Sequence, residues 1–263
     1  MGELIFWPIL LFMLGAGVGS FIAASADRIG KKQKNTGRSQ CDKCGHELNV
    51  IDLTPIFGWI IRGGKCHYCK KPIGVRPIII EIISGCLFAA SYLMLTAGQP
   101  FNIISIIQFV LWLIMLSGLM YLFISDIQYR RMPNRVMYPV MIFSAISWLV
   151  TSVTVEHNYY SLIAELGLAM LPLAGFYGIV FWLTKGKMVG LADIKLCVAI
   201  GFLLPWQGSL TVLALSNILA LLFVLPSLLS GKLKTADSVP FGPFLIISLI
   251  LVFGAMKFFV NFF

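Results

Sequence analysis

The sequence predicts an all-α polytopic membrane protein with about eight transmembrane helices and one small zinc-binding loop domain on the cytoplasmic side. Hydrophobic residues make up 59% of the 263 residues, against ~45–50% in soluble domains. Charged residues make up only 12%, and the mean hydropathy is +0.90. This composition excludes a disordered chain and an ordinary soluble domain, because it carries more apolar surface than a globule of this size can bury.

Apolar stretches of roughly 18–25 residues, the length that a helix needs to cross a bilayer, recur along the chain. The expected spans are 4–26, 77–97, 102–125, 136–153, 161–184, 191–205, 207–229 and 240–262. The sixth is the weakest, and an alternative with seven spans merges the sixth and seventh across Pro205. The first span is not expected to be a cleavable signal peptide, because its basic flank follows the apolar run instead of preceding it.

The formal net charge of +9 indicates how these spans are oriented. Nineteen of the 20 Lys and Arg residues lie in or beside every second connection. Because cytoplasmic loops of membrane proteins are enriched in Lys and Arg, both termini are expected outside the cytoplasm. The cytoplasmic connections are then 27–76, 126–135, 185–193 and 230–239. The excess charge is a topology signal that also favours contact with the lipid bilayer, and no nucleic-acid partner is needed to explain it.

Residues 27–76 are the only segment with the composition of a soluble domain, and they separate the first helix, 1–26, from the bundle of 77–263. Four cysteines lie there in the patterns CDKC and CHYC, with 21 residues between the patterns: Cys41, Cys44, Cys66 and Cys69. Two such pairs supply the four thiolates of a tetrahedral structural zinc site. The reducing cytoplasm argues against disulfides. An iron–sulfur centre or a thioredoxin-like redox pair is the alternative, although a redox pair needs only one CxxC.

Two aspartates stand at the cytoplasmic edge of the predicted spans. Asp126 ends the third span and Asp193 opens the sixth, so the topology places both carboxylates at the same depth. A carboxylate at membrane depth is costly, which makes each a candidate for function. Gly190 and the small Ala192 would let a backbone or a substrate approach Asp193 closely.

Two facing carboxylates share a proton, because like charges a few ångströms apart do not both ionise cheaply. One then acts as base on a water and the other as acid on a substrate carbonyl. These are the catalytic groups that aspartic peptide hydrolysis requires. From the residues alone, two alternatives stay open. Asp126 could pair with Arg130 or Arg131, and Asp193 with Lys195, as interface charges. The acids could instead couple ions in a membrane transporter with a zinc-stabilised cytoplasmic module.

Several short motifs follow one another along the chain. They are Gly19-Ser20-Phe21 followed by Arg28, the two cysteine pairs, Arg76-Pro77 with Glu81 and Gly85, the Asp126 segment ending in Met132-Pro133-Asn134, and Gly-x-x-Asp at 190–193. In this order, over nearly the whole chain, they make it resemble the type IV prepilin peptidases. These are bifunctional leader peptidases and N-methyltransferases of the bacterial inner membrane.

The resemblance implies that Asp126 and Asp193 are the catalytic pair of a membrane aspartic protease of the GxGD type. Here Ala192 replaces the second glycine of the usual Gly-x-Gly-Asp motif. The implied substrate is a prepilin or pseudopilin, whose apolar helix lies in the bilayer while its short basic leader hangs in the cytoplasm.

The resemblance also implies a methyltransferase half in the cytoplasmic loop and the helix 77–97. Glu81 and Gly85 match its motif, which implies Glu81 for methyl transfer, Gly85 for cofactor binding and S-adenosylmethionine as the methyl donor. The usual Arg-Tyr-Pro run reads Arg76-Pro77 here, without the tyrosine. The alternative is a peptidase that does not methylate, in which Glu81 simply pairs with Arg76.

Overall fold

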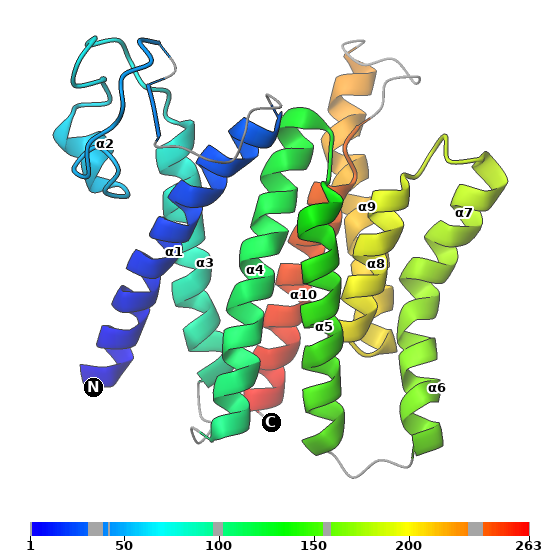
Figure 1. Cartoon of the computed structure of the whole chain (residues 1–263). Coiled ribbons are helices and arrows are strands. Elements are labelled where there is room, and N and C mark those ends of the chain that lie inside the picture. The colour runs from blue at the N-terminus through cyan, green and yellow to red at the C-terminus, as the bar shows by residue number, and fades with distance from the viewer. Residues whose placement is uncertain are drawn as a thin grey trace. The chain divides into compact units, whose positions relative to one another are not determined.

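The computed structural model describes residues 2–30, 39–41, 43–96, 102–154, 159–230 and 239–262. Within them the chain is helical apart from two isolated β-bridges, Gln40–Glu47 and Lys65–Pro72, and it forms two compact units, residues 1–98 and 99–263 (Figure 1). The helices are α1 (Gly2–Gly30), α2 (Phe57–Ile61), α3 (Arg76–Thr96), α4 (Ile103–Tyr129), α5 (Asn134–Thr154), α6 (Tyr159–Met170), the π-helical turn η1 (Leu171–Gly175), α7 (Phe176–Thr184), α8 (Leu191–Leu203), α9 (Trp206–Leu229) and α10 (Gly242–Phe262). Parts of two predicted basic connections, 31–38 and 231–238, lie outside the described residues.

Six helical stretches of the described chain are long and apolar enough to cross a membrane, which makes this a multi-pass membrane protein. They are Ile5–Arg28, Arg76–Met94, Ile103–Tyr129, Asn134–Val153, Tyr160–Thr184 and Trp206–Leu229. Each of the eight predicted spans coincides with a helical segment. The sixth is α8, which has only 13 residues and is about 20 Å long. It does not merge with α9, because Leu204 and Pro205 between them have extended backbones.

In the first unit, α1 and α3 lie side by side and touch through small residues (Figure 1). A Cβ at Gly15 would lie 2.6 Å from the carbonyl oxygen of Ser84, and a Cβ at Gly19 would lie 2.5 Å from the Ser84 hydroxyl. Glycine permits this close approach, as it does at many interfaces between membrane helices. An ion pair of 2.8 Å between Arg76 and Asp27 joins the end of α1 to the start of α3.

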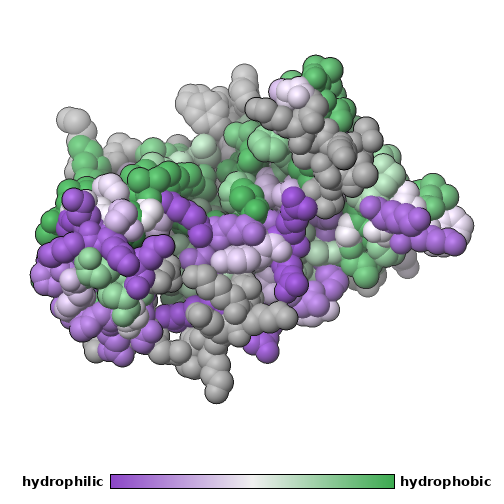
Figure 2. Space-filling view, turned by 90° about the horizontal axis from the view of Figure 1, so that it is seen from above, coloured by the Kyte–Doolittle hydropathy of each residue, from purple (hydrophilic) through white to green (hydrophobic). Residues whose placement is uncertain are grey.

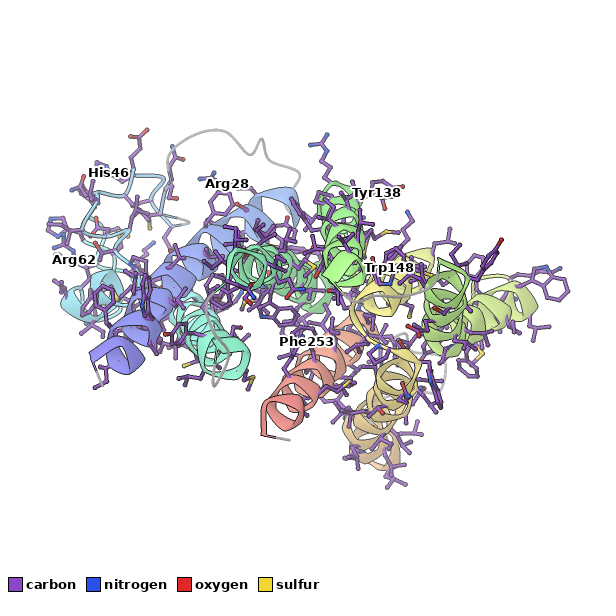
Figure 3. All side chains as sticks on the ribbon, turned by 90° about the horizontal axis from the view of Figure 1, so that it is seen from below. Arg28, His46, Arg62, Tyr138, Trp148 and Phe253 are labelled. Carbon is purple, nitrogen blue, oxygen red and sulfur yellow. The ribbon has the colours of Figure 1, made fainter. Side chains whose placement is uncertain are left out.

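In the second unit, the short helix α8 lies in the core. It contacts α5, α6, α7, α9 and α10, and its Leu196 and Ile200 are fully buried. A helix that is enclosed by protein does not have to match the thickness of the hydrocarbon. Beside it, α10 packs on α4 through the stacked rings of Phe253 and Trp112, whose centroids are 4.0 Å apart; Phe253 is labelled on α10 in Figure 3.

The C-terminal end of α4 and the first residues of α8 and α10 lie at the same end of the second unit (Figure 1). The chain leaves α4 and α7 there through Arg130 and Lys185, which both have left-handed backbones. This end of the second unit therefore brings together two of the predicted basic connections and the segments that carry Asp126 and Asp193.

The glycine contact between α1 and α3 predicts that Gly15→Ala lowers the thermal unfolding midpoint of the detergent-solubilised protein. The added methyl has no room against Ser84, and overpacking of this kind costs about 1–3 kcal/mol. Gly17→Ala on the same helix is the matched control, because a Cβ there meets nothing within 4 Å. Equal midpoints for the two variants would contradict the tight helix pair.

Candidate functional site

Two tight turns bring the four cysteines together in the first unit. The N–H of Gly45 donates to the carbonyl of Cys41 at 2.8 Å, and the N–H of Lys70 donates to that of Cys66 at 3.0 Å. Both Gly45 and Lys70 have left-handed backbones. The four Sγ atoms lie within 4.8 Å of one another, and those of Cys41 and Cys69 are 4.0 Å apart. The predicted cysteines thus form one four-sulfur cluster.

The cluster is compatible with a tetrahedral structural zinc ion. Zn–S bonds of about 2.3 Å place the sulfurs of a tetrahedron about 3.8 Å apart, close to the distances here. The neighbouring His46 and His67 lie against the ring of Tyr68, at 3.5 and 5.1 Å between centroids; His46 is labelled in Figure 3. The four thiolates would therefore hold the ion.

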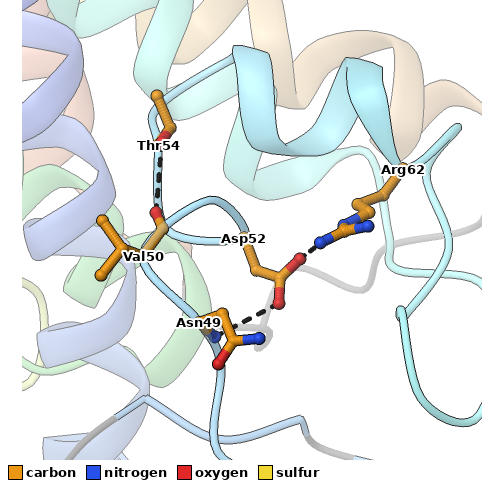
Figure 4. Close-up of polar contacts among 5 residues, drawn as sticks. All are labelled: Asn49, Val50, Asp52, Thr54 and Arg62. Atoms are coloured by element: carbon orange, nitrogen blue, oxygen red, sulfur yellow. Dashed lines mark hydrogen bonds and ion pairs between the residues drawn. The ribbon is translucent and has the colours of Figure 1, made fainter.

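An ion pair joins the two sides of α2 in the segment between the two cysteine pairs (Figure 4). Arg62 Nε donates to Asp52 Oδ1 at 2.7 Å, and the side chain of Asp52 is only 7% exposed. Burial raises the pKa of Asp52, but hydrogen bonds from Arg62 and the N–H of Asn49 outweigh it and lower the pKa on balance. The Thr54 hydroxyl also donates to the Val50 carbonyl at 3.1 Å. The outer surface of the loop, at the left of Figure 2, is mainly hydrophilic with hydrophobic residues among the polar ones.

Glu81 is buried at the start of α3, where its side chain binds the cysteine loop. It is 7% exposed, and its Oε2 accepts a hydrogen bond of 2.7 Å from the backbone N–H of Ile56. Arg76, the partner considered for it in the sequence, pairs instead with Asp27. The structure thus connects Glu81 to the loop between the cysteine pairs, a contact that the sequence did not predict.

Gly85 lies one turn further along α3, against α1. A Cβ there would lie 2.8 Å from the ring of Phe12 and 2.9 Å from its carbonyl oxygen. Close helix packing accounts for glycine at this position. Gly85 is covered by Phe12, and Glu81 is only 7% exposed, with its Oε2 bonded to Ile56.

Asp193 lies in the first turn of α8, and its carboxylate turns back to the start of its own helix. The N–H of Gly190 donates to Asp193 Oδ2 at 3.1 Å, and the N–H of Asp193 donates to the Gly190 carbonyl at 3.1 Å. Asp193 Oδ1 is buried with no hydrogen-bond partner among the described residues. Ala192 is already helical, a conformation that suits alanine better than glycine. This explains how the sequence tolerates the loss of the second glycine.

Asp126 lies in the last turn of α4 and is 6% exposed. Its carboxylate lies against the backbone of Gly242, the first residue of α10. A Cβ at Gly242 would lie 2.9 Å from Asp126 Oδ2 and 3.0 Å from the sulfur of Met132. The absence of a side chain at Gly242 is what lets the start of α10 reach the carboxylate.

The two aspartates lie at the same end of the second unit, Asp126 in the last turn of α4 and Asp193 in the first turn of α8 (Figure 1). Lys195, the partner considered for Asp193, binds Asn134 Oδ1 at 2.9 Å and the Tyr138 hydroxyl at 3.3 Å. Figure 3 labels Tyr138 on α5.

The sequence did not single out Gly242, although a signal was there. The run Pro240-Phe241-Gly242-Pro243 follows the basic connection 230–239 and opens the eighth predicted span. By the topology argument it belongs to the same membrane edge as Asp126. A glycine in a short segment bounded by two prolines can mark a place where the backbone approaches another group.

Two family models match separate parts of the chain. Residues 13–95 match the bacterial peptidase A24 N-terminal domain, and residues 113–225 match the type IV leader peptidase family. The first match falls within the first unit and the second within the second unit. No solved structure was found to match the chain.

Curated relatives from several bacteria carry the name prepilin leader peptidase/N-methyltransferase. The relative from Bacillus subtilis (strain 168) is 27% identical over 89% of this chain and 88% of its own length. Those from Pseudomonas aeruginosa and Burkholderia pseudomallei (strain 1026b) are 29% and 27% identical over 80% and 79% of this chain. The chain covers 69% of the Pseudomonas protein and only 64% of the Burkholderia protein.

The cysteine cluster predicts one zinc ion per chain in the purified protein, measured by inductively coupled plasma mass spectrometry. Cys66→Ser should lose most of this zinc, because it removes one of four thiolates from a site that must be tetrahedral. Cys86→Ser, at an exposed cysteine of α3 outside the cluster, should retain it. Full zinc content in Cys66→Ser would contradict the assignment.

Proposed function

The chain belongs to the type IV leader peptidase family, and we propose that it removes the short basic leader of type IV prepilins or pseudopilins. The two carboxylates at one end of the second unit carry this proposal: Asp126 is buried against the backbone of Gly242, and Asp193 accepts the N–H of Gly190. The match to the peptidase family covers the unit that contains them. The curated relatives are named for action on prepilins.

The proposed mechanism is hydrolysis by two aspartates, one ionised and one protonated. The ionised carboxylate takes a proton from water as the water oxygen attacks the carbonyl carbon of the scissile peptide bond, and the protonated one gives its proton to the carbonyl oxygen. The tetrahedral diol then collapses. Its C–N bond breaks, the amine takes the proton held by the first aspartate, and a diol hydroxyl returns a proton to the second.

We assign the base to Asp193 and the acid to Asp126. Asp193 Oδ1 is buried and free of protein partners among the described residues, which suits an oxygen that binds and activates water. Its other oxygen accepts the N–H of Gly190 at the start of α8, and the positive end of a helix favours the ionised form. Gly190 and Ala192 leave room for a substrate backbone beside this carboxylate.

We propose the membrane orientation that the distribution of Lys and Arg residues indicates. The cysteine loop and both aspartates face the cytoplasm, and both termini lie outside it in the bacterial inner membrane. A prepilin whose apolar helix lies in the bilayer would then present its leader junction at the depth of Asp126 and Asp193. Zinc in the cysteine cluster would have a structural role, because four thiolates leave no open position for catalysis.

Methylation of the new N-terminus is the second activity that we propose. It is supported by the names of the relatives and by the match of residues 13–95 to the N-terminal domain of the family. S-adenosylmethionine would supply the methyl group. Glu81 is the residue on which we expect methylation to depend, and Gly85 remains the candidate cofactor-binding position, although close packing occupies it.

The peptidase mechanism predicts that Asp126→Asn and Asp193→Asn each lower leader cleavage by ~100-fold or more, because each removes a general acid or base. Cleavage of a purified prepilin by the detergent-solubilised enzyme measures this. Glu165→Gln is the control, since it removes an exposed carboxylate of α6. Full cleavage by either aspartate variant would exclude the mechanism, and loss of cleavage in the control would show that the assay reports general damage.

The contact between α10 and α4 predicts that Gly242→Ala also impairs cleavage, by ~10–100-fold, because small displacements of a catalytic group are costly. The added methyl would lie 2.9 Å from Asp126 Oδ2 and would push the carboxylate out of place. Gly167→Ala, where a Cβ meets nothing within 4 Å, should cleave like the wild type. Unchanged cleavage in Gly242→Ala would contradict the role given to this contact.

A further inference from the structure

The backbone of Ile56 adopts an unusual conformation in the loop between the cysteine pairs. Its φ is +63° and its ψ is −55°, and the N–H of Phe57 donates to the carbonyl of Pro55 at 2.6 Å. Together these define a three-residue γ-turn of the rare kind with positive φ. For a β-branched residue this region is strongly disfavoured, so the turn needs support from its surroundings.

Glu81 supplies that support. Its carboxylate accepts the N–H of Ile56 at 2.7 Å, although the two residues are 25 positions apart. Burial excludes competing water, and a hydrogen bond in such surroundings is electrostatically stronger than one in water. Because Glu81 lies in the second turn of α3, this bond docks the turn onto the helix.

The γ-turn at Ile56 also sets the position of the rest of the loop. It leads directly into α2, whose Gly58 lies against the backbone of Ile51 and Asp52, 2.7 and 2.8 Å from where a Cβ would be. Asp52 binds Arg62 after α2, only four residues before the second cysteine pair. A continuous series of contacts therefore runs from Glu81 through Ile56 to the cysteine cluster.

We propose that Glu81 is a positioning residue for methyl transfer, which acts by holding the strained turn at Ile56 and so fixing the cysteine loop on α3. This inference rests on the proposed methyltransferase activity for its functional readout. One of the two carboxylate oxygens, Oε2, is committed to Ile56, and the residue is only 7% exposed. We therefore place its contribution in holding the loop.

Substitutions at Glu81 distinguish a positioning role from direct contact with the methyl donor. Glu81→Ala leaves the Ile56 N–H without its acceptor and should lower methylation by about tenfold or more. Glu81→Gln keeps an amide oxygen that can accept the same N–H, and it should retain more methylation than Glu81→Ala. The methylated fraction of the mature substrate is measured by mass spectrometry. Limited proteolysis between the cysteine pairs, followed in the full-length protein, should show a more accessible loop in Glu81→Ala.

A second substitution tests the turn itself. Glycine adopts positive φ without the penalty that isoleucine carries, so Ile56→Gly should partly restore methylation and loop protection in the Glu81→Ala background, by about fivefold. Ile51→Gly in the same background is the matched control. It removes an exposed isoleucine of the same loop whose φ is not positive, and it should restore neither.

The outcomes distinguish the alternatives. Glu81→Ala with an undisturbed loop, or a loop restored by Ile56→Gly without any recovery of methylation, would overturn the positioning role. Equal losses in Glu81→Gln and Glu81→Ala would do the same. If the wild-type protein cleaves its substrate without methylating it, the proposed methyltransferase activity fails, whereas the proteolysis pattern of the four variants still decides whether Glu81 holds the turn.

Discussion

A carboxylate among apolar helices is tolerated only where N–H donors replace the water that it has lost, and this requirement organises the second unit. Asp193 takes its N–H from Gly190 at the start of α8. Asp126 lies against the backbone of Gly242 at the start of α10, where a Cβ would be 2.9 Å from its Oδ2. Both glycines lie at the positive ends of helices, which favour negative charge. The end of α4 and the starts of α8 and α10 therefore have to converge.

This convergence explains features that look unrelated in the sequence. The helix α8 can be short because it is packed against α5, α6, α7, α9 and α10 and does not have to match the thickness of the hydrocarbon. Gly242 has no side chain because the space where a Cβ would lie is filled by Asp126 and Met132. Both features fit the proposed site, since acidic groups are brought near one another mainly where the chemistry needs them.

Much of this architecture could be predicted from the sequence, because it follows from local composition. Hydrophobic stretches predicted the membrane helices, cysteine spacing predicted the cluster, and the cost of buried charge pointed to Asp126 and Asp193. Gly242 was missed because its contact joins helices more than a hundred residues apart, which no periodicity encodes. The turn at Ile56 was missed for a different reason. Isoleucine opposes the conformation that it adopts, so tertiary contacts override local preference there.

The cysteine loop shows how a segment without a core is held in place. Among its described residues, 39–41 and 43–75, only Gly58, Gly64 and Cys66 are buried, so apolar packing contributes little. Its shape depends instead on a few directional contacts: the thiolate cluster, the pair of Asp52 with Arg62, and the bond from Ile56 to Glu81. Where packing is distributed over many side chains, the loss of one contact is shared among the rest. In this loop few buried side chains can compensate for a lost contact, so the position of the loop is sensitive to single polar groups.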